Sequence, residues 1–263
     1  MLMSDSTQNT NPLFTSRIHY PVNFDGCCES NIPYDVDPSL VMDIYYPKSM
    51  KSRVPVVIFV TGYPDFGFEQ MMGMKIKQIQ QYISWAQLFA ASGIAAITYT
   101  NVNPEKDIFT LLQYLEDNST ALGIDSNYVS IWSCSGNVPN ALSVLAEKTQ
   151  VKCAAFLYGY TIDIHSSQAV EHASKSFGFV NPAIRGILTK LPPVLVVRAG
   201  KDEMPGLNDS IDSFVSQCLR QNQPLTLLNL PNSNHAFDVV DNQGCTQQTI
   251  HTILGFFKDH FTR

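Results

Sequence analysis

The chain has 263 residues, of which 44% are hydrophobic and 15% are charged, and its net charge is −6. This balance excludes an intrinsically disordered chain, which needs more charge and fewer apolar residues, and it leaves no basic surface for nucleic acid. No run approaches the roughly 18 apolar residues of a membrane span. Residues 1–14 are mostly polar, lack the basic and apolar regions of a secretory signal, and are expected to form a loose tail.

Six cysteines stand at positions 27, 28, 134, 153, 218 and 245, and their spacing matches no metal-binding pattern. Cys153 and Cys218 lie inside apolar runs, which favours small buried hydrophobic residues over disulfide partners. We therefore expect reduced thiols, a cytoplasmic location and no bound metal. Both a monomer and a homodimer are compatible with the sequence.

In chain order, eight short apolar or alternating runs predict β-strands. They cover Arg17–Tyr20, Leu40–Tyr46, Val54–Val60, Ile94–Tyr99, Tyr128–Trp132, Cys153–Leu157, Val194–Val197 and Leu225–Leu230. The third run, VPVVIFV, is apolar throughout, as expected of a strand that is covered on both faces. The first two runs fit antiparallel strands at one edge of a sheet.

Helical periodicity separates the later runs. Apolar residues recur at intervals of three and four over 85–89, with Gly93 as a stop, and over 108–115, 207–219 and 250–257. Strands alternating with helices predict an α/β fold, here an eight-stranded, mostly parallel sheet with helices on both faces. The connection 158–191 is long, and we expect a short helical cap at about 160–190. No linker or repeat divides the chain, so residues 1–263 are expected to form a single domain.

A candidate nucleophile follows the fifth predicted strand, where Ser133-Cys134-Ser135-Gly136-Asn137 leads into a predicted helix over 138–147. A strand, a tight turn with a central serine and a helix is the setting of a nucleophile elbow. The turn lifts the Ser135 hydroxyl off the sheet, and the backbone N–H of Gly136 can donate to a developing oxyanion. Cys134 lies at the wrong position of the turn to attack.

A serine hydroxyl needs a base, and the base needs an acid that orients it. The candidate base is His235, just after the eighth predicted strand, and the candidate acid is Asp202, just after the seventh. Glu203 and Asp209 are nearby alternatives to Asp202. The candidates occur in the order Ser, Asp, His, each beyond the carboxyl end of a predicted parallel strand, where open α/β sheets hold their sites.

From about Leu40 to the C-terminus, the sequence resembles the α/β-hydrolase family, and within it the dienelactone-hydrolase-like and serine esterase branches. The resemblance rests on the strand that ends in Thr61-Gly62-Tyr63-Pro64-Asp65, on Leu122-Gly123-Ile124-Asp125, on the elbow, on Ala199-Gly200-Lys201-Asp202 and on Asn234-His235-Ala236-Phe237. It implies a Ser135–His235–Asp202 triad, with the backbone N–H of Tyr63 as second oxyanion donor beside Gly136. It also implies hydrolysis of an ester or a related acyl bond, such as a thioester or lactone.

The elbow departs from the family pattern G-x-S-x-G, because Ser133 and Asn137 replace both outer glycines. Thr61-Gly62 also replaces the usual His-Gly of the oxyanion loop. No member of the triad is lost, so these changes bear on the rate and the substrate class more than on the fold. They keep two alternatives open: a degenerate hydrolase that binds a ligand without hydrolysis, and an acyltransferase of the same fold.

The substrate is expected to be a small acyl compound. Just after the oxyanion loop stand Phe66, Met71 and Met72, which form either a flexible apolar wall for an acyl group or a core-facing loop. Tyr158 and Tyr160, after the sixth predicted strand, are further candidates for the pocket border. No glycine-rich phosphate loop is present, and the predicted chemistry needs no cofactor.

Overall fold

The computed structural model describes residues 11–50, 52–148, 150–163, 167–182 and 190–261. It contains an eight-stranded sheet in the order β1-β2-β4-β3-β5-β6-β7-β8. The strands are β1 (Cys27–Pro33), β2 (Val41–Tyr46), β3 (Val54–Phe59), β4 (Ala95–Tyr99), β5 (Ile124–Cys134), β6 (Ala154–Leu157), β7 (Val194–Ala199) and β8 (Leu225–Leu230). The pairs β1–β2 and β2–β4 are antiparallel and the remaining pairs are parallel. The predicted eight-stranded, mostly parallel sheet is confirmed.

The strand predicted at Arg17–Tyr20 is wrong. This segment is an irregular connection that buries Ile18, whose backbone N–H donates to Ser84 Oγ over 3.1 Å. The edge strand is β1 instead, and its side chains are exposed except for the half-buried Ile32. A strand that buries so few side chains lacks the alternation of apolar and polar residues by which a strand is recognised in sequence.

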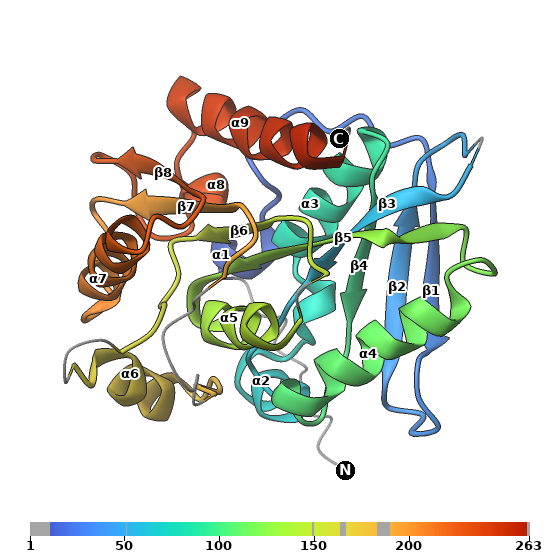
Figure 1. The fold of residues 1–263 in the computed structure, drawn as a ribbon, viewed down its shortest axis with the longest axis horizontal. Helices are drawn as coiled ribbons and strands as arrows, with labels where there is room; N and C mark the ends of the chain where they lie inside the picture. The colour runs from blue at the N-terminus through green and yellow to red at the C-terminus, as the bar shows by residue number, and fades with distance from the viewer. Residues whose placement is uncertain (1–10, 51, 149, 164–166, 183–189, 262–263) are drawn as a thin grey trace, which may run out of the picture.

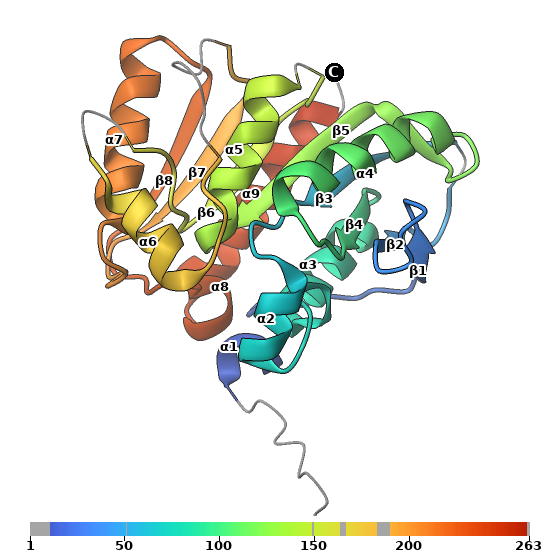
Figure 2. The same ribbon diagram turned by 90° about the horizontal axis from the view of Figure 1, so that it is seen from below.

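Helices cover both faces of the sheet (Figure 1). The α-helices are α1 (Pro12–Thr15), α2 (Asp65–Met72), α3 (Gln80–Ala91), α4 (Pro104–Asn118), α5 (Val138–Glu147), α6 (Ala169–Phe177), α7 (Leu207–Arg220), α8 (Phe237–Val240) and α9 (Gly244–Phe261), and the 3-10 helices are η1 (Ile76–Gln78) and η2 (Ser135–Asn137). On one face pack α4, α5 and α7, and on the other pack α3 and α9 (Figure 2). Within the described part of the chain, no helix has the length and apolar character that crossing a membrane requires.

The helices predicted from apolar periodicity are confirmed, since the stretches 85–89, 108–115, 138–147, 207–219 and 250–257 all fall inside observed helices. Gly93 follows the end of α3 with a φ of +88°, a left-handed conformation that glycine adopts without steric cost. The predicted stop of this helix is therefore confirmed as well.

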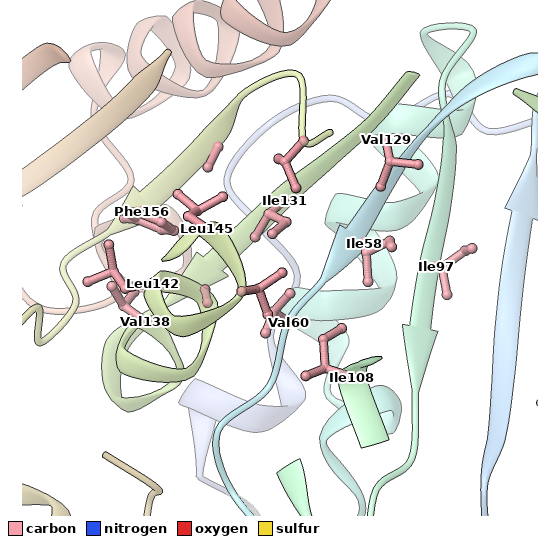
Figure 3. Close-up of a cluster of buried hydrophobic side chains, with 14 of the residues drawn as sticks. Ile58, Val60, Ile97, Ile108, Val129, Ile131, Val138, Leu142, Leu145 and Phe156 are labelled. Atoms are coloured by element: carbon pink, nitrogen blue, oxygen red, sulfur yellow. The ribbon is translucent and has the colours of Figure 1, made fainter. Parts of the chain in front are cut away.

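The layer between the sheet and the helices α4 and α5 shows how the core is built (Figure 3). Figure 3 labels Ile58, Val60, Ile97, Val129, Ile131 and Phe156 on the strands and their ends, and Ile108, Val138, Leu142 and Leu145 on the two helices. Burying one such side chain stabilises the fold by about 1.5–3 kcal/mol. This packing fixes α5 on the sheet, and with it the turn that precedes α5.

The amino-terminal segment departs from the loose tail predicted over residues 1–14. Residues 1–10 lie outside the described residues, but Pro12–Thr15 form α1, so the prediction is corrected for this part. Asn11 Oδ1 accepts the backbone N–H of Leu13 over 3.0 Å and caps the helix. The ring of Phe14 packs edge-on against Phe68 of α2, with 6.0 Å between centroids, so α1 lies beside α2 (Figure 2).

The stretch predicted as a cap over about 160–190 contains the helix α6. Residues 164–166 and 183–189 of this stretch lie outside the described residues. The carboxylate of Asp163 accepts the backbone N–H groups of Val170 and Glu171, both over 2.9 Å, and thereby holds the first turn of α6. Val170 and Ala173 are buried, so this helix is docked on the body of the protein by an apolar face.

Candidate active site

Ser135, Asp202 and His235 meet at one edge of the sheet, where they follow β5, β7 and β8. Ser135 Oγ lies 3.0 Å from His235 Nε2, and His235 Nδ1 lies 2.6 Å from Asp202 Oδ2. Because a carboxylate only accepts, its presence assigns the ring proton to Nδ1 and leaves Nε2 to accept from the serine hydroxyl. The three side chains form one continuous chain of hydrogen bonds.

The carboxylate that contacts His235 is that of Asp202, and not that of Glu203 or Asp209. The Asp202 side chain is 0% exposed, whereas Glu203 and Asp209 are exposed. Asp202 Oδ1 accepts the backbone N–H of Met204 over 3.0 Å, which leaves Oδ2 for the imidazole. A carboxylate shielded from water orients the ring more strongly than an exposed one.

Ser135 lies in a strained turn between β5 and α5. Its φ is +54°, in the left-handed region that residues other than glycine seldom adopt. The chain passes from Ser135 through η2 into α5, whose first turn contains Pro139, where a backbone N–H is not needed. Gly136 belongs to the first turn of this helical segment, whose N–H groups have no acceptor within the helix. Its amide is therefore suited to hold a negative charge that forms beside Ser135.

Asn137, which stands in place of the second elbow glycine, joins the elbow to the oxyanion loop. Its Oδ1 accepts the backbone N–H of Gly62 over 2.7 Å. Its Nδ2 donates to Tyr82 OH over 3.0 Å and to the carbonyl of Cys134 over 3.1 Å. The two segments come so close that a Cβ on Gly62 would lie 2.9 Å from the carbonyl oxygen of Gly136. The larger residue is accommodated because its amide supplies the hydrogen bonds of both segments.

Ser133 and Thr61 replace the other expected family residues, and both are buried and hydrogen-bonded. Ser133 Oγ donates to the carbonyl of Val60 over 3.0 Å. Thr61 Oγ1 accepts from Asn101 Nδ2 over 3.0 Å, and the Thr61 carbonyl accepts from Asn140 Nδ2 over 2.8 Å. Polar side chains of the neighbouring loop and of α5 thus hold the oxyanion loop in place.

Cys134, the neighbour of Ser135, is buried beside Tyr82. Burial raises the pKa of its thiol to about 12, so the thiol stays protonated at neutral pH. All six cysteines of the chain are free. Cys134 therefore does not compete with Ser135 as a nucleophile.

Asp241 holds the loop that contains His235 by hydrogen bonds to Asn234. The carboxylate of Asp241 accepts from the backbone N–H and the Nδ2 of Asn234, over 2.9 and 2.6 Å. On the other side of the histidine, Ala236 has a φ of +55° and leads directly into α8. The histidine is held between a hydrogen-bonded loop and a short helix.

A cavity of about 280 Å³ opens beside Ser135 and His235. Helices α1 and α2, the residues around η1 and the end of α6 supply much of its wall. The lining consists of Leu13, Phe14, Tyr63, Phe68, Met71, Met72, Ile76, Ile79, Gln81, Tyr82, Cys134, Ser135, Asn137, Tyr158, Ser176, Phe177, His235 and Ala236. Most of these side chains are apolar or aromatic, which suits the hydrocarbon part of a small ligand.

Of the five side chains predicted to border the pocket, Met71, Met72 and Tyr158 line this cavity, and Phe66 and Tyr160 do not. Phe66 is 73% exposed on the outer side of α2. Tyr160 is buried, stacks on Phe179 and donates its hydroxyl to the carbonyl of Pro205 over 3.0 Å. The sequence could not distinguish these two side chains from the other three, because the position of a residue after an element does not decide which way its side chain turns.

The part of the cavity wall that α1 contributes is not among the pocket residues predicted from the sequence. Leu13 and Phe14 line the cavity, although they belong to the segment predicted as a tail. The signal was present, since these two apolar residues follow Pro12 at the end of a polar stretch. Apolar residues beside a proline in a polar tail indicate a segment that docks back on the protein.

The oxyanion loop ends at Asp65, a buried carboxylate at the start of α2. Its oxygens accept the backbone N–H groups of Asn101 over 2.7 Å and of Ile76 over 3.4 Å. Burial raises the pKa of Asp65 from 3.8 to about 6, although these hydrogen bonds oppose the rise. The folded protein therefore holds the proton of Asp65 more tightly than an ordinary aspartate does.

Many solved structures match the chain, and three of them illustrate the likeness over nearly its whole length. A bacterial heroin esterase is 15% identical, with a TM-score of 0.68 over 92% of this chain and 87% of that chain. A thermostable carboxylesterase cloned from a metagenomic library is 14% identical, with a TM-score of 0.70 over 92% of each chain. An α/β hydrolase from a deep-sea metagenome library is 15% identical, with a TM-score of 0.65 over 91% of this chain and 100% of that chain.

No protein-family model and no curated protein matches the sequence. At an identity near 15%, the three likenesses show the fold alone. The chain has the α/β-hydrolase fold, as the sequence motifs predict. The dienelactone-hydrolase-like branch stays a prediction.

Proposed function

We propose that the protein is a serine hydrolase that cleaves a carboxylic ester or a related acyl bond, such as a thioester or lactone. The observation that carries the proposal is the unbroken chain of hydrogen bonds from Ser135 through His235 to the buried Asp202, beside an apolar cavity. A serine that only closes a turn needs neither a base in hydrogen-bond contact nor a positive φ.

In the first half of the reaction, Ser135 is acylated. His235 Nε2 takes the hydroxyl proton while Ser135 Oγ attacks the carbonyl carbon. The oxyanion accepts hydrogen bonds from the backbone N–H groups of Tyr63 and Gly136. The tetrahedral intermediate then expels the alcohol, thiol or ring oxygen, which takes the proton from His235. Asp202 stays ionised, keeps the ring proton on Nδ1 and stabilises the charged imidazole.

In the second half, water releases the acyl group. His235 removes a proton from the water molecule, whose oxygen attacks the acyl carbon on Ser135. Collapse of the second intermediate breaks the bond to Ser135 Oγ, and the serine recovers its proton from His235. The products are a carboxylic acid and the free enzyme. These steps use only side chains and amides of the chain.

The cavity supports a small, uncharged, largely apolar acyl group as the preferred substrate part. Its volume of about 280 Å³ lies just below the range of about 300–1,000 Å³ of sites for drug-sized ligands. Its charged or polar groups are few, and Ser135 and His235 lie on its wall, with Asp202 behind the histidine. A short aliphatic or a simple aromatic acyl group fits this description.

The test combines covalent labelling with turnover. A fluorophosphonate is expected to give one adduct, mapped to Ser135 by peptide mass, which heat-denatured protein and His235→Ala lack. A panel of nitrophenyl esters is expected to be hydrolysed without an added acceptor. Ser135→Ala should lose at least about three orders of magnitude in kcat while it stays folded. Ser130→Ala, which changes a buried serine on β5, the strand that leads to Ser135, is the matched control and should keep its turnover.

Other outcomes would contradict hydrolysis. Product that forms only when an alcohol or amine acceptor is supplied would indicate an acyltransferase. A folded protein that binds an ester saturably, yet gives neither adduct nor product, would indicate a ligand-binding protein with the same fold.

A further inference from the structure

A second carboxylate lies beside the active site, and the proposed reaction steps do not use it. Asp238, three positions after His235 and at the start of α8, is 0% exposed. It accepts hydrogen bonds from Trp85 Nε1 over 2.7 Å, from Gln81 Nε2 over 2.8 Å and from the hydroxyl of Tyr158 over 2.8 Å. Burial raises the pKa of Asp238, while these three hydrogen bonds oppose the rise. Keeping a carboxyl group in an apolar core is costly, so a specific use for it is expected.

One of the three donors to Asp238 is Tyr158, the residue directly after β6. Tyr158 has a φ of +35°, which a residue other than glycine seldom adopts, and its backbone N–H donates to the carbonyl of Val197 over 2.8 Å. Its phenol donates to Asp238 and also accepts from Gln81. Burial and the charge of Asp238 raise the pKa of the phenol well above its ordinary value, so it stays a donor. The ring is thus fixed both at its backbone and at its hydroxyl.

The fixed ring of Tyr158 packs on His235. The two rings have centroids 4.9 Å apart and planes inclined by 64°. On its other side, Tyr158 packs against Phe237, with centroids 5.6 Å apart. The imidazole has to meet Asp202 at Nδ1 and Ser135 at Nε2 at the same time, and a small rotation of its ring breaks one of these contacts.

We propose that Tyr158 is a positioning residue for His235 and that Asp238 anchors Tyr158. The aromatic ring restricts the rotation of the imidazole, and the hydrogen bond to Asp238 restricts the ring. The network ties α3, the end of β6 and α8 together around the histidine. This inference rests on the proposed triad chemistry, since it assigns a role to residues that touch neither the acyl carbon nor the leaving group.

The test compares Tyr158→Leu, which removes the ring, with Tyr158→Phe, which keeps the ring and removes its anchor. The matched control is Phe156→Leu, a buried aromatic on β6 that faces the other core layer. The rate of fluorophosphonate labelling at Ser135 is measured together with kcat and KM for a small acetate ester. We expect the labelling rate and kcat to fall about 100-fold in Tyr158→Leu and about tenfold in Tyr158→Phe, with KM little changed, and to stay unchanged in Phe156→Leu.

A double-mutant cycle tests the anchor. Asp238→Asn keeps the size of the side chain and removes one acceptor oxygen, so the labelling rate is again expected to fall about tenfold. Asparagine leaves a single acceptor oxygen for the three donors, which weakens the hold on Tyr158. If both changes act through the contact between Tyr158 and residue 238, the double variant Tyr158→Phe with Asp238→Asn should be no slower than either single variant. The melting temperature of each variant is recorded, so that a loss of fold is separated from a loss of rate.

The outcomes separate this inference from the proposed function. If the wild-type protein is labelled at Ser135 and Tyr158→Leu is labelled at the same rate, the inference is wrong and the proposed function stands. If the labelling rate and kcat fall as much in Phe156→Leu as in Tyr158→Leu, the role of Tyr158 is packing alone, and the inference is again wrong. If Tyr158→Leu fails to fold, the other two variants decide. Labelling rates equal to wild type in both Tyr158→Phe and Asp238→Asn would show that the hydrogen bond between Tyr158 and Asp238 does not position His235. Wild-type protein that is not labelled overturns the function and this inference together.

Discussion

The Asn137 side chain accepts the backbone N–H of Gly62 over 2.7 Å and so fixes the distance between the elbow and the oxyanion loop. The two proposed oxyanion donors, Gly136 and Tyr63, are the sequence neighbours of these two residues. At the second elbow position the family has glycine, which allows the two segments to come close. In this protein the side chain of Asn137 sets the spacing between them by a hydrogen bond.

Changing Asn137 to glycine restores the second glycine of the family pattern and is expected to lower both stability and reactivity. The backbone N–H of Gly62 and the carbonyl of Cys134 would lose their partner in a buried place, at a cost of about 1–3 kcal/mol each. We expect the free energy of unfolding to fall by about 2–6 kcal/mol, and the labelling rate of Ser135 to fall with it. Denaturant titration and labelling kinetics measure the two effects. A variant as stable as wild type would show that space, and not hydrogen bonding, governs this position.

A methyl group on Gly62 is expected to open the oxyanion hole. In Gly62→Ala the Cβ would lie 2.9 Å from the carbonyl oxygen of Gly136 and 3.1 Å from Asn137 Cα, so the backbone has to move. A displacement of this kind lowers kcat/KM by about 100-fold. The matched control is Gly67→Ala in α2, where a Cβ meets nothing within 4 Å. Equal activity of the two variants in an ester assay would contradict the assignment of this loop.

Stability is expected to depend on pH through Asp65. Its pKa in the folded protein, about 6, lies above its ordinary value of 3.8. The folded state therefore binds this proton more tightly than the unfolded state, so the contribution of Asp65 is fully present below pH 3.8 and is lost as the pH rises through 6.

Asp65→Asn removes this titration and isolates the effect. The difference in unfolding free energy, wild type minus variant, should decrease as the pH rises from 4 to 7 and level off above that. Denaturant titrations of both proteins over this range give the difference directly. A difference that increases with pH would mean that Asp65 is stabilised as an anion.

Phe14 is expected to set the acyl-chain preference. It lines the cavity from α1 and packs edge-on against Phe68. For wild type, each buried methylene should add about 0.8 kcal/mol, or about fourfold in kcat/KM, until the cavity is full. Phe14→Ala enlarges the cavity and should move the optimum of an ester series to longer chains. Phe24→Ala, an aromatic of the same terminal segment that packs on Tyr45 outside the cavity, should leave the optimum in place.

The sheet, the helices and the positions of the three candidate triad residues could be predicted because each depends on a local pattern. Such patterns predict local structure without knowledge of how the segments pack together. Examples are the apolar run over Val54–Val60, the helical spacing over 108–115 and the serine turn at Ser135. Chain order then places Asp202 and His235 at the same edge of a parallel sheet.

The rest depends on docking and could not be predicted. The edge strand β1 buries almost nothing, so its sequence lacks a hydrophobic signature. Phe66 and Tyr160 differ from Met71 and Tyr158 only in the direction in which the folded backbone turns them. The network around Asp238 joins residues 81 and 85 of α3 to residues 158 and 238, and no spacing rule connects these three segments. Such contacts exist only after α3, β6 and α8 have packed together.

The short helix α1 has a practical consequence for work on this protein. Residues 13 and 14 belong to the wall of the cavity, so under the proposed function the amino-terminal segment takes part in ligand selection. An affinity tag fused close to these residues, or a protease cut that removes them, would change the shape of the pocket and not only the length of the chain. Two preparations that differ only at their amino terminus would then rank the same esters differently, and each ranking would be correct for its own preparation.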